Sequence, residues 1–298
     1  MFVSEIWRYP VKSMGGEQLE SAHLTPEGID GDRVVQVYAR PGRMATARTW
    51  PDLLGFHSRL DSHGKPLVDG KLWSDPEVQE AVRKVVDPAA RLAYSERLER
   101  FDILPLLVAT DGAIAAFGRD RRRLRPNIVL GGVEGLAERE WEGGRLLIGD
   151  VVIYIDSLRE RCNMTMIDPD TLDFDPGVLR DIVKRFGGKL ALNCDVIRGG
   201  DIRVNQKSGS SGPDRQKVIC SAMINARAAT LTPLQPGSSF HAPQEMDIRS
   251  TPPRNPSRLA LLRRDSIRES YREAHGRACN DSSPFHGQDN PCRSTIRF

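Results

Sequence analysis

The sequence predicts a mainly β fold with peripheral helices, followed by a disordered tail. Three observations predict this. Short apolar segments of strand length outnumber segments with helical spacing, turn-forming residues separate them, and the composition changes near residue 207. The 298 residues are 39% hydrophobic and 28% charged, which is typical of a chain with a packed core. We therefore expect an ordered region over residues 1–206.

Alternating polar and apolar side chains predict the first strands. Residues 5–9 and 33–38 alternate in this way, and residues 28–32 supply glycine and aspartate for a turn just before the second strand. Residues 146–155 predict two strands that meet at Gly149 and Asp150. Four further apolar runs predict strands at 104–109, 128–130, 190–197 and 202–204.

Two segments, residues 75–86 and 175–186, have helical spacing. Their apolar side chains recur every three or four residues, which places them on one face of a helix. These side chains are Val78, Ala81, Val82 and Val85 in the first segment, and Val178, Leu179, Ile182, Val183 and Phe186 in the second. Because such segments are few, we expect the helices to lie at the periphery of a β-rich region.

Residues 207–298 differ from the rest of the chain in charge and composition. They hold 14 Lys and Arg against 8 Asp and Glu, together with 9 Pro and 13 Ser. A basic segment rich in Ser and Pro, with few aliphatic clusters, is typical of disordered chain. One hypothesis is that this tail binds acidic partners and that the chain is an interaction protein.

Charge, hydropathy and cysteine usage exclude several classes of protein. The net charge is only +3, which argues against a broad surface for nucleic acid. No apolar run approaches the roughly 20 residues that span a bilayer, and the N-terminus lacks the basic and apolar blocks of a signal peptide. Five cysteines without a CxxC motif favour a reduced, cytoplasmic protein.

A first cluster of candidate site residues follows the first predicted strand. Lys12 offers a cation and Ser13 a hydroxyl, and Gly15 and Gly16 allow the backbone to approach a ligand closely. These are the groups that a phosphate or another oxyanion needs. The alternative is an ordinary polar loop.

A second cluster precedes the predicted strand at 128–130. Arg125 and Asn127 flank Pro126, which restricts the backbone between them, so both side chains are candidates for an anion pocket. The neighbouring arginines at 121–123 are more typical of a solvated face.

A third cluster surrounds Cys162. Arg159 and Arg161 lie close to it in sequence and would favour its thiolate. A thiolate can bind a soft or redox-active metal, or act as a nucleophile. The alternative is an inert, buried cysteine.

Taken in order, these motifs resemble the MOSC domain proteins, a family named for the C-terminus of molybdenum-cofactor sulfurase. The similar segments are YPVKS at 9–13, RPNIV at 125–129, RCNMTMIDPDT at 161–171 and GDIRV at 200–204. The resemblance implies an N-terminal β-barrel region over residues 1–85, a MOSC-type β-barrel core over 86–206, and a molybdenum-molybdopterin cofactor held between them. It also implies, at the level of the family, pyridoxal phosphate binding.

The resemblance implies a role for each candidate residue. Cys162 would give its thiolate to molybdenum, and Asp168 would orient the loop that carries it. The phosphate of the cofactor would be bound by Lys12, Ser13 and Arg33. The pterin and substrate side would be lined by Arg125, Asn127, Arg161 and Asn193.

The enzymatic relatives that the family suggests are the amidoxime-reducing component and bacterial reductases of N-hydroxylated bases. The implied activity is reduction of a small N-hydroxylated substrate by removal of its oxygen atom at the molybdenum. It needs an external electron donor of the ferredoxin or flavoprotein type, since the cysteines do not have the spacing of an iron–sulfur cluster. The alternative is a non-catalytic carrier of molybdenum cofactor or of sulfur.

The chain departs from the family pattern in two places. Glu160 stands where relatives often have serine, which puts a carboxylate beside the anionic cofactor. After Val204, the final strand that is usual in the family is replaced by Asn205, Gln206 and the basic tail. We expect this change to leave a strand edge exposed.

Overall fold

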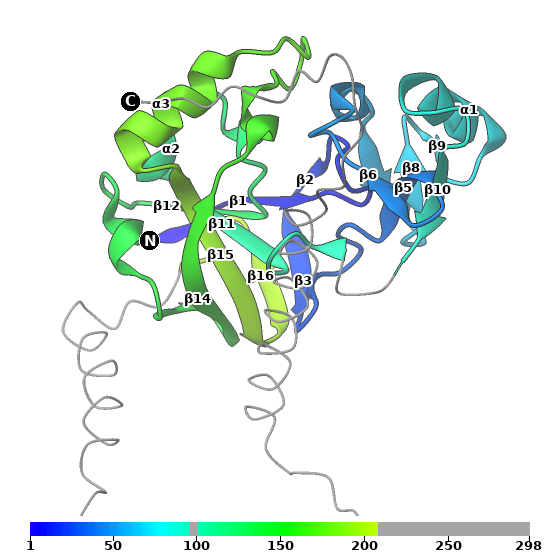
Figure 1. Ribbon diagram of the computed structural model, residues 1–298. Helices are drawn as coiled ribbons and strands as arrows, with labels where there is room; N and C mark the ends of the chain where they lie inside the picture. Colours follow the sequence, from blue (N-terminus) through cyan, green and yellow to red (C-terminus); the bar gives the residue numbers. More distant parts are fainter. Residues whose placement is uncertain (96–99, 208–298) are drawn as a thin grey trace, which may run out of the picture. The chain divides into compact units, whose positions relative to one another are not determined.

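The computed structural model describes residues 1–95 and 100–207 of the chain. Strands form most of the regular structure in this part, and the three α-helices found there have 7 to 11 residues (Figure 1). The prediction of a mainly β fold with peripheral helices is confirmed. Among the described residues, no helix is both long and apolar enough to cross a membrane.

The largest sheet has seven strands in the order β13-β14-β15-β11-β12-β1-β2. They are β1 (Phe2–Arg8), β2 (Glu17–Leu19), β11 (Leu106–Thr110), β12 (Ile128–Gly131), β13 (Arg145–Ile148), β14 (Val151–Glu160) and β15 (Lys189–Arg198). Neighbours are antiparallel except β11 and β12, which are parallel. The chain between β11 and β12 includes α2 (Asp111–Phe117), as a parallel connection requires.

The pairing of β1 with β12 brings two of the sequence motifs together. Ile6 lies opposite Ile128 in this antiparallel pair, so the segment that follows β1 runs beside the segment that precedes β12. The Trp7 amide donates to the Asn127 carbonyl at 2.7 Å, and the Tyr9 hydroxyl donates to the Pro126 carbonyl at 3.1 Å. The YPVKS and RPNIV segments are therefore neighbours.

Three smaller sheets complete the strands of the described residues, each with three strands. They are β10 (Arg91–Tyr94)-β5 (Val35–Arg40)-β6 (Arg43–Ala45), β16 (Gly200–Arg203)-β3 (Ser21–Thr25)-β4 (Gly28–Ile29) and β7 (Ser58–Leu60)-β8 (Pro66–Val68)-β9 (Lys71–Leu72). No sheet in this part of the chain closes into a barrel. In the large sheet, the outer strands β13 and β2 do not pair with each other. The closed barrels that the family resemblance implied are thus replaced by open sheets.

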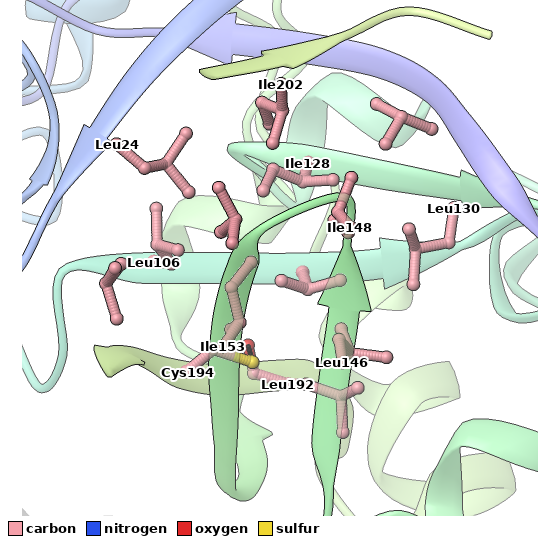
Figure 2. Close-up of a cluster of buried hydrophobic side chains, with 14 of the residues drawn as sticks. Leu24, Leu106, Ile128, Leu130, Leu146, Ile148, Ile153, Leu192, Cys194 and Ile202 are labelled. Carbon is pink, nitrogen blue, oxygen red and sulfur yellow. Dashed lines mark hydrogen bonds between the residues drawn. The ribbon is translucent and has the colours of Figure 1, made fainter. Parts of the chain in front are cut away.

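The main apolar core lies against the large sheet (Figure 2). Its side chains come from the large sheet and also from the β16-β3-β4 sheet, which contributes Leu24, Ile29 and Ile202. Cys194 of β15 is fully buried in this core, and burial raises the pKa of its thiol far above the ordinary value. Cys194 is therefore an apolar core side chain, whereas Cys162 is not.

Both helices expected from the sequence are present, and an aspartate caps the start of each. In α1 (Pro76–Val85) the Asp75 carboxylate accepts from the Glu77 amide at 2.8 Å. In α3 (Pro176–Phe186) Asp175 caps the Gly177 amide at 2.8 Å in the same way. Both helices have a proline in the first turn. Proline fits there because an N–H group at that position has no acceptor within the helix, so nothing is lost when it is absent. The buried face consists of Val78 and Val82 in α1 and of Val178, Ile182 and Phe186 in α3.

The sequence did not predict α2, and it did not predict the short 3-10 turns. With seven residues, α2 is too short to display a helical repeat, and its ends are set by Thr110, which caps the Ala113 amide at 3.1 Å, and by Gly118 at φ 66°. The 3-10 turns are η1 (Pro51–Gly55), η3 (Arg121–Arg123), η4 (Ala137–Glu140) and η5 (Asn163–Met166).

The end of the described part contacts the beginning of the chain. The Val3 amide donates to the Gln206 carbonyl at 3.1 Å, and the Asn205 amide donates to the Val3 carbonyl at 2.8 Å. These residues therefore cover part of β1, whereas the sequence predicts that the change after Val204 leaves a strand edge exposed. Apart from Lys207, the predicted disordered tail lies outside the described residues, and the domain boundaries at 85 and 206 stay predictions.

Candidate functional site

One pocket gathers most of the candidate residues. It opens where the segment after β1, the segment before β12 and the end of β14 meet, and it encloses about 590 Å³ including its mouth. Its lining holds seven cationic side chains and two acidic ones. The lining residues are Lys12, Ser13, Arg33, Thr46, Arg48, Asp102, Leu107, Arg123, Leu124, Arg125, Arg159, Glu160, Arg161, Cys162 and Met164. Such an excess of cations favours an anionic ligand.

Three lining residues have an unusual backbone conformation. Ser13, Arg33 and Arg125 have φ values of 71°, 54° and 55°, in the left-handed region that residues other than glycine rarely adopt. Neighbouring strands hold this backbone, since the Lys12 amide donates to the Val35 carbonyl at 2.9 Å and the Arg33 amide to the Tyr9 carbonyl at 2.8 Å. Strained backbone of this kind is common at binding sites, where it aims a side chain.

A buried carboxylate joins the segments beneath the pocket. Asp32 is fully buried and accepts from the Tyr9 amide at 2.7 Å, from the Asn127 side-chain amide at 3.2 Å and from the Arg33 guanidinium. A buried carboxylate needs such donors to offset its lost hydration. Asp32 thereby holds Arg33 at the pocket and ties the end of β1 to the start of β12.

Two of the pocket's arginines lie over the ring of Tyr9. The guanidinium carbons of Arg125 and Arg33 are 4.2 Å and 5.2 Å from its centroid. The ring attracts both cations and so lowers the cost of placing them close together. Burial raises the pKa of Tyr9 to about 12 and lowers that of Arg125 to about 10, so at neutral pH the phenol is neutral and the guanidinium is charged.

Asp102 is the carboxylate on which three of the cations converge. Its oxygens lie 2.9 Å from Lys12 Nζ, 2.5 Å from an Arg48 nitrogen and 3.2 Å from an Arg159 nitrogen. Burial alone would raise the pKa of Asp102, but these three cations outweigh it and hold that pKa well below its usual range. Burial lowers the pKa of Lys12, and Asp102 offsets part of that effect.

This arrangement predicts how Asp102 affects stability at low pH. Because its pKa is depressed in the folded chain, the carboxylate contributes stability that is fully present above about pH 4 and is lost as the pH falls further. In Asp102→Asn we expect a smaller loss of stability between neutral and acidic pH than in the wild type. Urea unfolding midpoints across that range test this. Asp30→Asn, which changes an exposed carboxylate, is the control, and equal pH dependence in all three proteins would contradict the prediction.

Cys162 lies at the point where β14 has ended and η5 begins. It is half-buried, and its carbonyl accepts from the Thr165 hydroxyl at 2.8 Å and from the Thr165 amide at 3.1 Å. Beside it, one nitrogen of Arg161 donates to the Leu124 carbonyl at 2.8 Å. The Nε and Nη1 atoms of Arg161 are buried and have no partner within the described residues. Burial lowers the pKa of this guanidinium, but not enough to remove its charge at neutral pH.

Comparison with known proteins finds two domains along this chain. Residues 1–88 match the family described as the MOSC N-terminal beta barrel domain, and residues 113–207 match the MOSC domain. Together these matches cover more than half of the chain. The chain belongs to the MOSC family.

Curated relatives match more than half of this MOSC chain. Mitochondrial amidoxime-reducing component 1 of Homo sapiens is 26% identical over 233 residues, which cover 57% of this chain and 67% of that protein. Mitochondrial amidoxime reducing component 2 of Bos taurus is 25% identical over 227 residues, which cover 57% and 67%. Among solved structures, the YUAD protein from Bacillus subtilis is 12% identical with a TM-score of 0.37, covering 68% of this chain and 91% of that one.

Six of the nine candidate residues line the pocket of this MOSC chain, and three lie outside the lining. Those in the lining are Lys12, Ser13, Arg33, Arg125, Arg161 and Cys162. Asn127 is buried below it and bonds to Trp7, Asp32, Arg33 and Leu107. Asn193 is buried behind Arg159 and accepts from it at 3.3 Å. Asp168 pairs with Arg123 at 2.7 Å.

Sequence reasoning missed Arg48 and Asp102 and undervalued Arg123. Arg48 and Asp102 carry no local motif, so only the contacts between distant segments place them at the pocket. Arg123 belongs to the arginine run, which we expected to form a solvated face, yet its side chain is only 10% exposed.

The close approach of a ligand to the backbone at Gly15 and Gly16 stays a prediction, and neither glycine is part of the pocket lining. A Cβ on Gly15 would meet the Phe56 carbonyl at 3.2 Å, and one on Gly16 would meet the Arg8 carbonyl at 2.3 Å. Gly16 is therefore required by packing against the protein itself, and Gly15 is tightly packed.

Proposed function

We propose that this chain binds a molybdenum-pterin cofactor in the cationic pocket and uses it to reduce small N-hydroxylated compounds. The observation that carries the proposal is the convergence of one half-buried thiol, Cys162, with seven cationic side chains around one pocket. The names of the curated relatives, which are amidoxime-reducing components, support the same reaction class.

The residues of the pocket fit such a cofactor. A phosphate group requires charged donors and hydroxyls, and Lys12, Arg33 and Ser13 supply these from adjacent positions in the lining. The two buried nitrogens of Arg161 have no partner within the described residues, so a bound ligand with acceptor atoms would complete their hydrogen bonding. Cys162 supplies a thiolate, which is a suitable ligand for a soft, redox-active metal.

In the proposed reaction the bound cofactor supplies two electrons, and with two protons the N–O bond is broken to give the amine-type product and water. The chain's residues bind and orient. Lys12, Ser13 and Arg33 would hold the phosphate, Arg125 and Arg161 would face the pterin, and Cys162 would hold the metal. Asn127 and Asn193 do not line the pocket. Asn127 would position Asp32 and Arg33 by hydrogen bonds, and Asn193 would position Arg159 in the same way.

Electrons would reach the chain from an external protein of the ferredoxin or flavoprotein type. The relatives' names give no support to the expected pyridoxal phosphate binding, and the cytoplasmic location stays a prediction.

The proposal predicts the metal content of the purified protein. From cells that make molybdenum cofactor, we expect near-stoichiometric molybdenum and pterin in the full chain. Cys162→Ser removes the metal ligand, so we expect it to lose most of its molybdenum or to change the electronic spectrum of the metal. Elemental mass spectrometry, spectroscopy and a pterin assay on the same samples measure this.

Cys194→Ala is the matched control, because this cysteine is buried in the core and its thiol does not line the pocket. We expect it to keep the metal. Folded wild type that contains neither molybdenum nor pterin would overturn the proposal. Bound cofactor without reductase activity toward N-hydroxylated compounds, with an artificial electron donor, would instead identify the chain as a carrier.

A further inference from the structure

The three arginines of η3 differ in what their side chains contact. All three are ion-paired, but the Arg123 side chain is 10% exposed, whereas Arg121 and Arg122 are each 36% exposed. Of the three, only Arg123 lines the pocket. Their acidic partners are Glu5 for Arg121, Asp120 and Asp170 for Arg122, and Asp168 for Arg123.

Arg123 is bonded to the loop that carries Cys162 at two points. Its Nη2 donates to Asp168 Oδ2 at 2.7 Å, and its Nη1 donates to the Thr165 carbonyl at 3.3 Å. Thr165 is fully buried, and its hydroxyl donates to the Cys162 carbonyl at 2.8 Å. The Arg123 guanidinium is therefore connected to the backbone of Cys162 through Thr165, by one hydrogen bond on each side of that residue.

The other side of Cys162 is tied to the same corner of the chain. Arg161 donates to the carbonyl of Leu124 at 2.8 Å, and Leu124 directly follows Arg123. The corner at residues 123–124 thus contacts the residue before Cys162 and the turn after it. A loop held on both sides keeps its side chain in one place, because the bonds remove alternative backbone conformations.

Asp168 completes this arrangement. While Oδ2 accepts from Arg123, Oδ1 accepts from the Asp170 amide at 3.0 Å and from the Thr171 amide at 3.1 Å. Its carboxylate therefore closes the turn at residues 168–171, which lies beyond η5, and also anchors that turn to Arg123 of η3. The backbone hydrogen bonds, with Arg123, lower the pKa of Asp168, so it is ionised at neutral pH.

We infer that Arg123 is a positioning residue that holds the Cys162 thiol in place through Thr165 and Asp168. This inference rests on the proposed function, in which Cys162 must meet a metal at a defined point. In that proposal Arg123 does not itself touch the metal. The alternative is that Arg123 acts only as one more cation in the pocket.

The two possible roles of Arg123 predict different effects of replacing Asp168. If Arg123 acts through the loop, then Arg123→Gln and Asp168→Asn break the same anchor and should have the same effect on Cys162. If Arg123 acts only by its charge, the substitutions should have opposite effects, because one removes a positive charge near the thiol and the other removes its neutralising partner.

The test measures alkylation of Cys162 in the full chain, made in cells without molybdenum cofactor. The reagent is iodoacetamide, which is neutral and so is not attracted by the cations, and the Cys162 peptide is followed by mass spectrometry. We expect Arg123→Gln and Asp168→Asn each to speed alkylation about threefold or more, because the released loop exposes the sulfur. The double variant should react no faster than either single variant, since both break one anchor.

Two further variants make the outcome decisive. Arg121→Gln is the matched control, because Arg121 lies in the same turn and pairs with Glu5, away from Cys162, and we expect its rate within about twofold of the wild type. Arg123→Lys should restore a rate near the wild type. If Arg123→Gln fails to fold, Thr165→Val takes its place, because it removes the hydroxyl that bonds to the Cys162 carbonyl without changing any charge. Faster alkylation in Thr165→Val supports the anchor, and an unchanged rate contradicts it.

Opposite effects of Arg123→Gln and Asp168→Asn, or unchanged rates in both, would overturn the inference. Thermal unfolding midpoints of all variants separate loosening of this loop from general instability. The alkylation assay uses protein without cofactor, so its result bears only on the role of Arg123. The molybdenum measurement tests the proposed function separately.

Discussion

Replacing Asp32 with alanine is expected to destabilise the folded chain by about 3–5 kcal/mol, because it removes one partner of a buried ion pair. Asp32 is fully buried, and its loss would leave the Tyr9 amide, the Asn127 amide and the Arg33 guanidinium without an acceptor that they now share. The free energy of unfolding, from urea denaturation at neutral pH, measures the effect.

The control for this prediction lies two residues earlier. Asp30 is exposed, so Asp30→Ala should change the stability by no more than about 0.5 kcal/mol. Asp32→Asn should fall between the two, because it keeps an oxygen for the Tyr9 amide but loses the charge that faces Arg33. A change below about 1 kcal/mol for Asp32→Ala would contradict the view that this carboxylate organises the floor of the pocket.

The second large effect concerns binding of the proposed cofactor by Lys12. Lys12→Ala should weaken retention of the pterin by about 30-fold or more, since losing one buried, charge-paired donor costs about 2 kcal/mol or more. The fold should survive, because Asp102 keeps Arg48 and Arg159 as partners. The pterin that remains after gel filtration, measured at several protein concentrations, gives the change in affinity.

Lys71→Ala is the matched substitution. Lys71 is exposed and pairs with Glu77 on the surface, so its loss should leave pterin retention unchanged. Equal retention by the Lys12 variant and the wild type would show that the phosphate lies elsewhere. Loss of pterin in both variants would point to a general defect in the protein and not to this site.

Eight of the sixteen strands and two of the three α-helices among the described residues could be predicted, because their signals are local. The alternation in residues 5–9 and the capping aspartates Asp75 and Asp175 act within a few residues of the element that they specify. The helix α2 could not be predicted, because seven residues do not complete two helical turns. Its presence follows from the parallel pairing of β11 with β12, which needs a crossover connection.

The candidate site was predictable only in part, for a related reason. A motif indicates that Lys12 or Cys162 is important, but it does not tell which way a side chain points. Asn127 and Asn193 belong to the same motifs as pocket residues, yet both are buried as hydrogen-bond partners of the arginines. Burial of cations requires such polar partners, and a sequence does not separate the partner from the ligand-binding residue.

By itself, the sequence determined that this protein is mainly β, that two of its helices lie within residues 75–86 and 175–186, and that its motifs contain several cationic side chains and one candidate thiol. These follow from short-range periodicity, capping and residue chemistry. The tertiary structure alone decided that Asp102 gathers three of the cations and that Arg123 contacts the Cys162 loop. These contacts join residues more than 40 positions apart, and such pairings are set by how the sheets and turns pack.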